Sequence, residues 1–150
     1  MRKYFYLFVL ALMPMCFAAC GGDDEASGVA SVTTLYGTWK ATNHVAVFEG
    51  SNQHQSERSD YIAEYLHFGE DGICLVHGGG RGHFSSDGSY AFTFDEQKTT
   101  LRIGSRIFAV DALSSNTLKL KEIYGQDSQG KEEYLQVTYQ KVSDSVWENL

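Results

Sequence analysis

The chain has 150 residues, of which 43% are hydrophobic, and its 19 acidic and 12 basic residues give a formal net charge of −7 at pH 7. This length is enough for one domain with a hydrophobic core of its own. The acidic balance repels nucleic-acid phosphates and anionic lipid headgroups, so we exclude nucleic-acid binding.

The first 19 residues have the pattern of a secretory signal peptide. Arg2 and Lys3 precede an uncharged run over residues 4–19, which matches the basic head, apolar stretch and small final residues of such signals. The run is shorter than the roughly 20 apolar residues that a membrane-spanning helix needs, and Pro14 interrupts it. We therefore expect residues 1–19 to be removed.

A cysteine follows at the end of this signal. Ala18 and Ala19 stand directly before Cys20, which resembles the lipobox of bacterial lipoproteins, with Phe17 where that family usually has leucine or another aliphatic residue. The resemblance implies that Cys20 is lipidated and becomes the first residue of a chain held on a membrane by its lipid. The alternative is an ordinary cleavable signal in which Cys20 has no role.

The sequence GGDDE occupies residues 21–25. It resembles the acidic export tag of surface lipoproteins of Bacteroidetes-type bacteria, which implies a lipid-anchored protein of the outer membrane that faces the cell surface. The alternative is a solvated acidic linker, since short charge runs usually form one. Loss of residues 1–19 removes two basic residues and no acids, which leaves a formal net charge of −9. We expect residues 20–33 to be a lipidated cysteine and flexible tether, and residues 34–150 to be one domain.

Eight short strands and no long helix are predicted in this domain. In the first strand, residues 35–49, alternation places Trp39, Asn43 and Val47 on one face and His44 on the other. Strands with regular turn signals favour an antiparallel up-and-down barrel, and eight strands can enclose one small ligand. The other strands are expected near residues 61–68, 73–77, 89–94, 99–103, 106–110, 117–124 and 134–142, followed by a helical turn capped by Ser143.

The sequence predicts no metal site or cofactor. If residues 69–72 form a four-residue loop, His67 pairs across the hairpin with Cys74, and Glu64 pairs with His77. A histidine and a cysteine could begin a zinc site, but no third ligand is fixed by spacing. Because Cys74 is the one cysteine of the predicted domain, it has no intrachain disulfide partner and is expected to be a small buried residue.

Catalytic motifs are also absent from the sequence. The stretch GGGRGH at residues 78–83 lacks the Lys-Ser/Thr ending of a phosphate-binding loop and leads into a strand. There is no Gly-x-Ser-x-Gly elbow, and the neighbouring Glu132 and Glu133 point to opposite sides of a strand, so they cannot flank a sugar bond together. We therefore predict no catalytic residues and no enzyme.

Loop lengths predict one tight end and one elaborated end of the barrel. The loops after strands one, three and seven are long, whereas those after strands two, four and six are short, and long loops commonly carry function. Trp39 lies at the tight end, where the first strand begins. Near the mouth, beside His54, the candidate ligand-binding residues are Val47, Tyr61, His77, Arg81, His83, Tyr124 and Tyr134. The alternative is that these residues form a half-buried rim without a ligand.

Several short motifs resemble a known family. YGTWK at residues 36–40 resembles the Gly-x-Trp motif of lipocalins. LHFGEDG, GSYAFTF, TLKLKEIYG and YLQVTYQKV follow in an order that is similar to the lipocalin-like domains of Bacteroidetes lipoproteins. The resemblance covers residues 34–142 and implies a small up-and-down barrel with Trp39 plugging its closed base.

Two functions fit these observations. The leading hypothesis is a non-catalytic surface lipoprotein that captures a small apolar or amphipathic molecule inside the barrel. The alternative is a protein-interaction or inhibitor module, with a packed interior and a protein partner at the mouth loops. The two hypotheses differ in whether side chains such as Leu66, Phe92 and Leu118 fill the interior.

Overall fold

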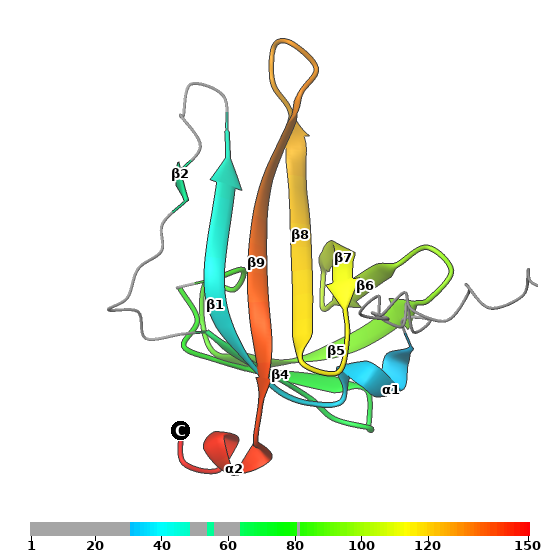
Figure 1. The fold of residues 1–150 in the computed structure, drawn as a ribbon, viewed down its shortest axis with the longest axis vertical. Helices are drawn as coiled ribbons and strands as arrows, with labels where there is room; N and C mark the ends of the chain where they lie inside the picture. Colours follow the sequence, from blue (N-terminus) through cyan, green and yellow to red (C-terminus); the bar gives the residue numbers. More distant parts are fainter. Residues whose placement is uncertain (1–30, 49–53, 56–63, 81) are drawn as a thin grey trace, which may run out of the picture.

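Eight antiparallel strands form a closed ring, which confirms the predicted all-β architecture. The computed structural model describes residues 31–48, 54–55, 64–80 and 82–150, so the predicted signal, Cys20 and the export tag lie outside the described residues. Strands β1 and β3 to β9 pair in sequence order, and β9 returns to pair with β1 (Figure 1). In the described part of the chain, the helices α1 (Val32–Leu35) and α2 (Asp144–Trp147) have four residues each.

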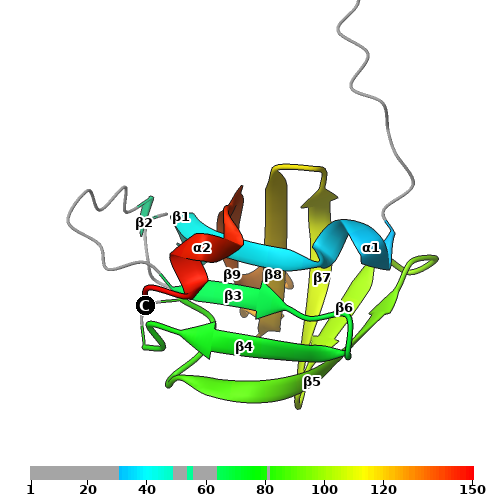
Figure 2. The ribbon, with the colours of Figure 1, turned by 90° about the horizontal axis from the view of Figure 1, so that it is seen from below.

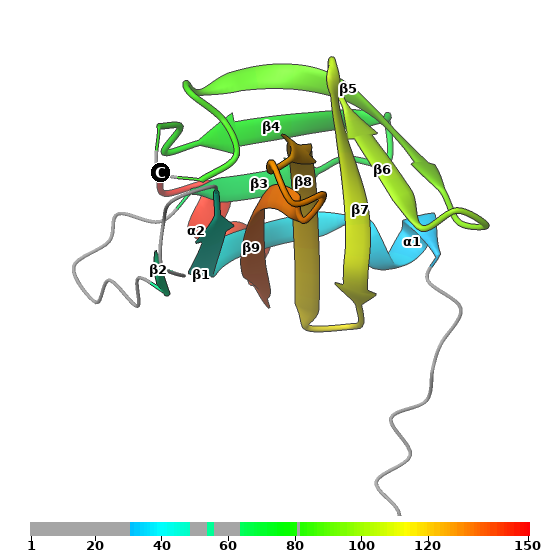
Figure 3. The same cartoon turned by 90° about the horizontal axis from the view of Figure 1, so that it is seen from above.

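The strands differ in length, and the longest ones lie together. β1, β8 and β9 have 10 or 11 residues, and the β8–β9 hairpin extends beyond the body of the ring (Figure 1). Figure 3 shows the ring from above, with β3 to β5 on one side and β1, β9 and β8 on the other. The strand bounds are β1 (Gly37–Val47), β2 (His54–Gln55), β3 (Tyr65–Phe68), β4 (Ile73–His77), β5 (Gly88–Asp95), β6 (Thr100–Ile103), β7 (Arg106–Leu113), β8 (Thr117–Gln126) and β9 (Glu132–Val142).

The closed end of the ring is covered by α1, which begins inside the segment expected to be tether. Ser31 caps this helix, and its last residue, Leu35, is fully buried. The indole Nε1 of Trp39, also fully buried, donates to the carbonyl of Leu35 over 2.7 Å. Lys141 Nζ lies 5.0 Å from the Trp39 ring centroid and donates to the carbonyl of Thr34. The start of β1, the end of β9 and α1 are thereby tied together.

Helix α2 covers part of the outer face, on the side seen in Figure 2. As predicted, Ser143 caps it and accepts the N–H of Ser145. Thr38 of β1 donates to Asp144 over 2.8 Å. The ring of Trp147 stacks on His67 of β3 with centroids 5.4 Å apart.

A β-bulge at Thr42 changes the face of β1 that the sequence predicted. Ala41 pairs with Tyr139 and Asn43 with Thr138, so Thr42 is an extra residue. Beyond the bulge His44 lies opposite Val137, which is fully buried inside the ring. The prediction that Asn43 and Val47 share the face of Trp39 is therefore wrong, because one inserted residue reverses the alternation.

The β3–β4 hairpin has a different register from the one expected. Phe68 pairs with Cys74, and His67 pairs with Leu75. Phe68 and Cys74 are buried inside the ring, whereas His67 faces Thr38 and Trp147 on the outside. Burial of one face sets the register, so the predicted pairing of His67 with Cys74 does not occur. Likewise His77 pairs with Tyr65 rather than with Glu64.

Large apolar side chains fill the lower part of the interior. Leu66 and Leu118 are fully buried, Phe68 meets Phe92 edge to face at 5.0 Å, and Phe108 is also fully buried. Cys74 is a free, buried thiol whose pKa is raised by burial and then by the charge of Glu64. A thiol held in its neutral form is a poor nucleophile and metal ligand. Cys74 is therefore part of the apolar core.

The closed end depends on the bond between Trp39 and Leu35. Trp39→Phe removes the buried donor and leaves the Leu35 carbonyl unsatisfied, so we expect a loss of about 1–3 kcal/mol in the free energy of unfolding. The measurement is denaturant-induced unfolding followed by circular dichroism. Trp147→Phe on the outer face is the matched control. A loss in the control as large as that in Trp39→Phe would contradict this account.

Candidate functional site

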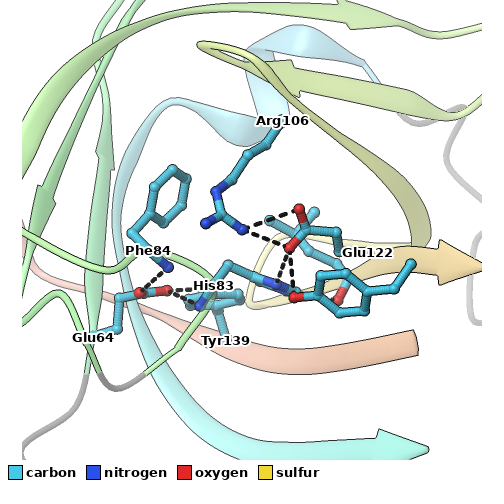
Figure 4. A network of polar contacts seen from close by, with 8 residues as sticks. Glu64, His83, Phe84, Arg106, Glu122 and Tyr139 are labelled. Carbon is cyan, nitrogen blue, oxygen red and sulfur yellow. Dashed lines mark hydrogen bonds and ion pairs between the residues drawn. The ribbon is translucent and has the colours of Figure 1, made fainter. Parts of the chain in front are cut away.

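Charged and polar side chains gather inside the ring toward the end opposite α1. We call this group the buried polar network, and Figure 4 shows most of it. Its members come from the residue before β3, from the loop between β4 and β5, and from β7, β8 and β9. They are Glu64, His83, Arg106, Glu122, Tyr124 and Tyr139.

Glu64 is the centre of one half of the network and is fully buried. Its Oε1 accepts the hydroxyl of Tyr139 over 2.7 Å and the backbone N–H of His83 over 3.2 Å, and its Oε2 accepts the N–H of Phe84 over 2.9 Å. Burial raises the pKa of Glu64, and these donors together with His83 oppose the rise. Burial, followed by the charge of Glu64, also raises the pKa of Tyr139. A buried carboxyl needs such partners, because leaving it unpaired is costly.

The donors to Glu64 come from a loop that folds into the ring. We call residues 78–80 and 82–87, between β4 and β5, the plug loop. Its His83 and Phe84 are each only 3% exposed. The Phe84 ring packs against Tyr90 at 5.3 Å, and the His83 ring meets Phe108 edge to face at 4.7 Å. The sequence predicted a mouth loop here, and the structure adds that its tip is buried.

Two glycines let the plug loop pack this closely. A Cβ on Gly79 would lie 2.2 Å from the backbone of Ser86, so the two arms of the loop touch. A Cβ on Gly82 would lie 2.4 Å from the Glu64 carboxylate. Both distances are far shorter than a normal carbon contact, so a side chain at Gly79 would displace the Ser86 backbone and one at Gly82 would displace the Glu64 carboxylate.

Glu122 is the centre of the other half. Arg106 Nη1 donates to both of its oxygens over 3.0 and 2.8 Å, and the Tyr124 hydroxyl donates to Oε2 over 3.0 Å. His83 Nδ1 lies 3.5 Å from the same Oε2. Burial alone would raise the pKa of Glu122, but His83, Arg106 and Tyr124 outweigh it and hold the pKa below its ordinary value. Glu122 is thus an ionised carboxylate at neutral pH.

His83 joins the two halves. Its backbone N–H is bound to Glu64, while its ring Nε2 lies 3.1 Å from the carbonyl of Leu120. A carbonyl oxygen can only accept, so Nε2 carries a hydrogen. His44 lies nearby on the inner face of β1, and its pKa is lowered by burial and then by the charge of His83.

Two of the predicted ligand-binding residues belong to the network. His83 is buried inside it. Tyr124 sits at a bulge in β8, between Ile123 and Gly125, and is 52% exposed. Its hydroxyl reaches Glu122, and its ring lies 5.6 Å from that of Phe48.

The other predicted residues lie elsewhere. Val47 pairs with Tyr134 on the face opposite that of Ala46 and Leu135, and Lys121 Nζ lies 4.3 Å from the Tyr134 ring centroid. His77 is on the outer side, with Nδ1 3.2 Å from Asp87 and its ring against Trp147. Tyr61 and Arg81 lie outside the described residues, and for His54 the structure describes only its place in β2, paired with Ala46.

The sequence prediction omitted Glu64, Arg106, Glu122 and Tyr139. One signal for Glu122 was available, because it continues the alternation of Leu118 and Leu120 on one face of its strand. A charged residue at an inward position of such a pattern indicates a buried ion pair.

Two comparisons of the chain with known proteins were negative. No protein-family model matches the chain, and a search of curated proteins finds no match. Among the described residues, none of the helices has the length and apolar character needed to cross a membrane. In the same part of the chain, no group of three or more His, Cys, Asp or Glu side chains is placed to hold a metal ion.

Gly82 provides a direct test of the packing around Glu64. Gly82→Ala places a methyl group against the carboxylate, so we expect a loss of about 1–3 kcal/mol in the free energy of unfolding from overpacking. Gly125→Ala is the matched control, since a Cβ there meets nothing within 4 Å. Denaturant-induced unfolding of both variants measures the difference. Equal stabilities would contradict the close approach of the plug loop to Glu64.

The raised pKa of Glu64 predicts a pH dependence of stability. The contribution of the Glu64 carboxyl to the free energy of unfolding is fully present below the ordinary pKa of 4.5. It is lost as the pH rises through the raised pKa of the folded state. Glu64→Gln does not titrate at this position. We therefore expect the free energy of unfolding of the wild type, relative to Glu64→Gln, to fall as the pH rises above 4.5. Denaturant-induced unfolding of both proteins, at steps of about one pH unit between pH 4 and 8, measures this difference in free energy of unfolding. A difference that rises with pH would show that the hydrogen bonds to the Glu64 carboxylate outweigh its burial.

Proposed function

We propose that this protein is a non-catalytic, lipocalin-like binding protein that holds a small amphipathic molecule at the open end of its ring. The observation that carries the proposal is the position of Arg106, Glu122 and Tyr124, whose polar groups meet inside the ring beside the Phe48–Tyr124 ring pair. Ligand sites typically combine aromatic walls with a few placed polar groups. A closed ring of eight strands is compatible with such a site.

Arg106 is the group best suited to meet a ligand's polar end. Its side chain is 33% exposed, and both of its hydrogen bonds to Glu122 use the same nitrogen, Nη1. A guanidinium has five N–H donors, so it can serve a further acceptor. Its Cζ lies over the Phe84 ring, 5.6 Å from the ring centroid, which is within the range of a cation–π contact.

Phe48 and Tyr124 suit the apolar part of the same ligand. They are 40% and 52% exposed, respectively. Two partly exposed aromatic rings next to a charged cluster present both an apolar and a polar surface over a short distance. This pairing of surfaces supports an amphipathic ligand rather than a purely apolar one.

The proposal includes a membrane anchor, which rests on the sequence alone. Cys20 and the acids after it support a lipidated outer-membrane protein displayed at the cell surface. Helix α1, the first described element, covers the closed end. With an anchor at Cys20, the chain would enter the ring from this end, and the open end would face away from the membrane.

A second candidate is a protein-interaction module, which the packed interior favours. Leu66, Phe108 and Leu118 are fully buried, and the plug loop adds Phe84 above them. An interior filled in this way leaves the exposed rings of Phe48 and Tyr124 as a surface for a protein partner.

Mass spectrometry of the purified protein distinguishes these candidates. Residues 31–150 contain every described element, so this fragment is expressed, purified without denaturant and extracted with organic solvent. We expect a stoichiometric small molecule that is lost in Phe48→Ala/Tyr124→Ala and retained in Ile107→Ala, a matched change at an exposed residue of β7. A stable protein that carries no ligand would refute the small-ligand proposal in favour of the second candidate.

A further inference from the structure

The two donors that Glu64 binds on the plug loop are not part of the ring wall. Glu64 and Tyr139 belong to the wall, where Tyr139 is a residue of β9. The N–H groups of His83 and Phe84 approach from a separate loop and meet one carboxylate oxygen each. The Glu64 carboxylate on the wall is therefore an acceptor, and the loop supplies its donors as a bound ligand would.

The aromatic rings of the loop also occupy places that suit a ligand. Phe84 lies between Tyr90 and Phe108, with ring centroids at 5.3 and 6.1 Å, and the Arg106 guanidinium lies over its face. His83 donates from Nε2 to the carbonyl of Leu120. The wall thus recognises an aromatic ring joined to neighbouring N–H donors.

The plug loop is rich in glycine. Gly78 and Gly80 adopt φ values of +74° and +91°, and residues 78–88 contain five glycines. Glycine gains more backbone freedom on release than any other residue, which offsets part of the contacts that are lost. An external molecule with the same groups therefore competes with a segment whose release regains backbone entropy.

We propose that the ring contains, under the plug loop, a binding site for aromatic molecules with adjacent N–H donors, and that His83 and Phe84 occupy it as an intramolecular ligand. The ligand class is an aromatic amide, whether a free small molecule or a segment of a peptide. This site lies under the plug loop, apart from the mouth residues Phe48 and Tyr124, so the inference goes beyond the proposed function.

The test removes the aromatic rings of the plug loop from the site and adds an aromatic amide as a separate molecule. In the full chain, His83→Gly/Phe84→Gly removes both aromatic rings from the site. We call this double substitution the vacated variant. The probes are N-acetylphenylalaninamide and the acetylated, amidated peptide Gly-His-Phe-Ser, and calorimetry measures their binding. We expect saturable binding to the vacated variant at least about tenfold tighter than to the wild type, because the wild type must first release its loop. A clear preference for the peptide assigns the site to peptide segments, and equal binding of both probes assigns it to small amides.

Two substitutions make the result specific. Glu64→Gln in the vacated background should weaken binding about tenfold, because it replaces one of the two acceptor oxygens with an N–H donor. Alanine in place of phenylalanine in the peptide should also weaken binding about tenfold. If the double variant does not fold, Phe84→Ala is tested in the same way. A folded vacated variant that binds neither probe, or that binds them no better than the wild type does, overturns the inference.

Phe48→Ala/Tyr124→Ala in the vacated background separates this inference from the proposed function. Probe binding that survives these changes supports a site under the plug loop, even if the wild type purifies without a ligand at its mouth. Probe binding that these changes abolish, while Glu64→Gln leaves it intact, places the probe at the mouth and overturns the inference.

Discussion

The upper half of the ring depends on one buried carboxyl group. Glu64 has no contact with solvent, and its oxygens accept hydrogen bonds from the plug loop and from Tyr139 of β9. A buried acceptor of this kind is stable only when its partners are held in place. The position of the loop, the start of β3 and the inner face of β9 are thus fixed by the same group. The second carboxylate, Glu122, is reached from this centre through His83.

Bulges in β1 and β8 change which side chains these strands turn toward the network. The bulge at Thr42 turns His44 inward, and the bulge at Tyr124 leaves its hydroxyl beside Glu122. A third register shift lies between Val110 and Ala112 of β7. Bulges re-aim side chains at the rims of barrels, where strands would otherwise continue a strict alternation. Tyr124 is therefore placed by an irregular position of β8, whereas Glu122 continues the regular alternation of the same strand.

Much of the fold follows from local patterns in the sequence, whereas the site does not. Alternation in β8, with Leu118 and Leu120 on one face, and the Gly104–Ser105 turn were enough to place the strands and their order. The bulge at Thr42 was not predictable, because Asn43 and Val45 continue the pattern of Trp39 as plausibly as His44 does. Glu64 was missed because glutamate is almost always exposed unless paired, and its partners are backbone groups from a loop 19 and 20 residues away.

Ring closure gives the folding reaction a particular order. The strands that close the ring are the first and the last, since Thr38 pairs with Val142 across almost the whole domain. Contacts between such distant residues form late and slowly, because a long chain segment must be ordered before they contribute. Until β9 has been made, β1 and β8 each keep an open edge, the state in which a sheet is most prone to join another chain. A ring of this topology thus stays vulnerable to aggregation through nearly all of its synthesis and becomes protected in one final step.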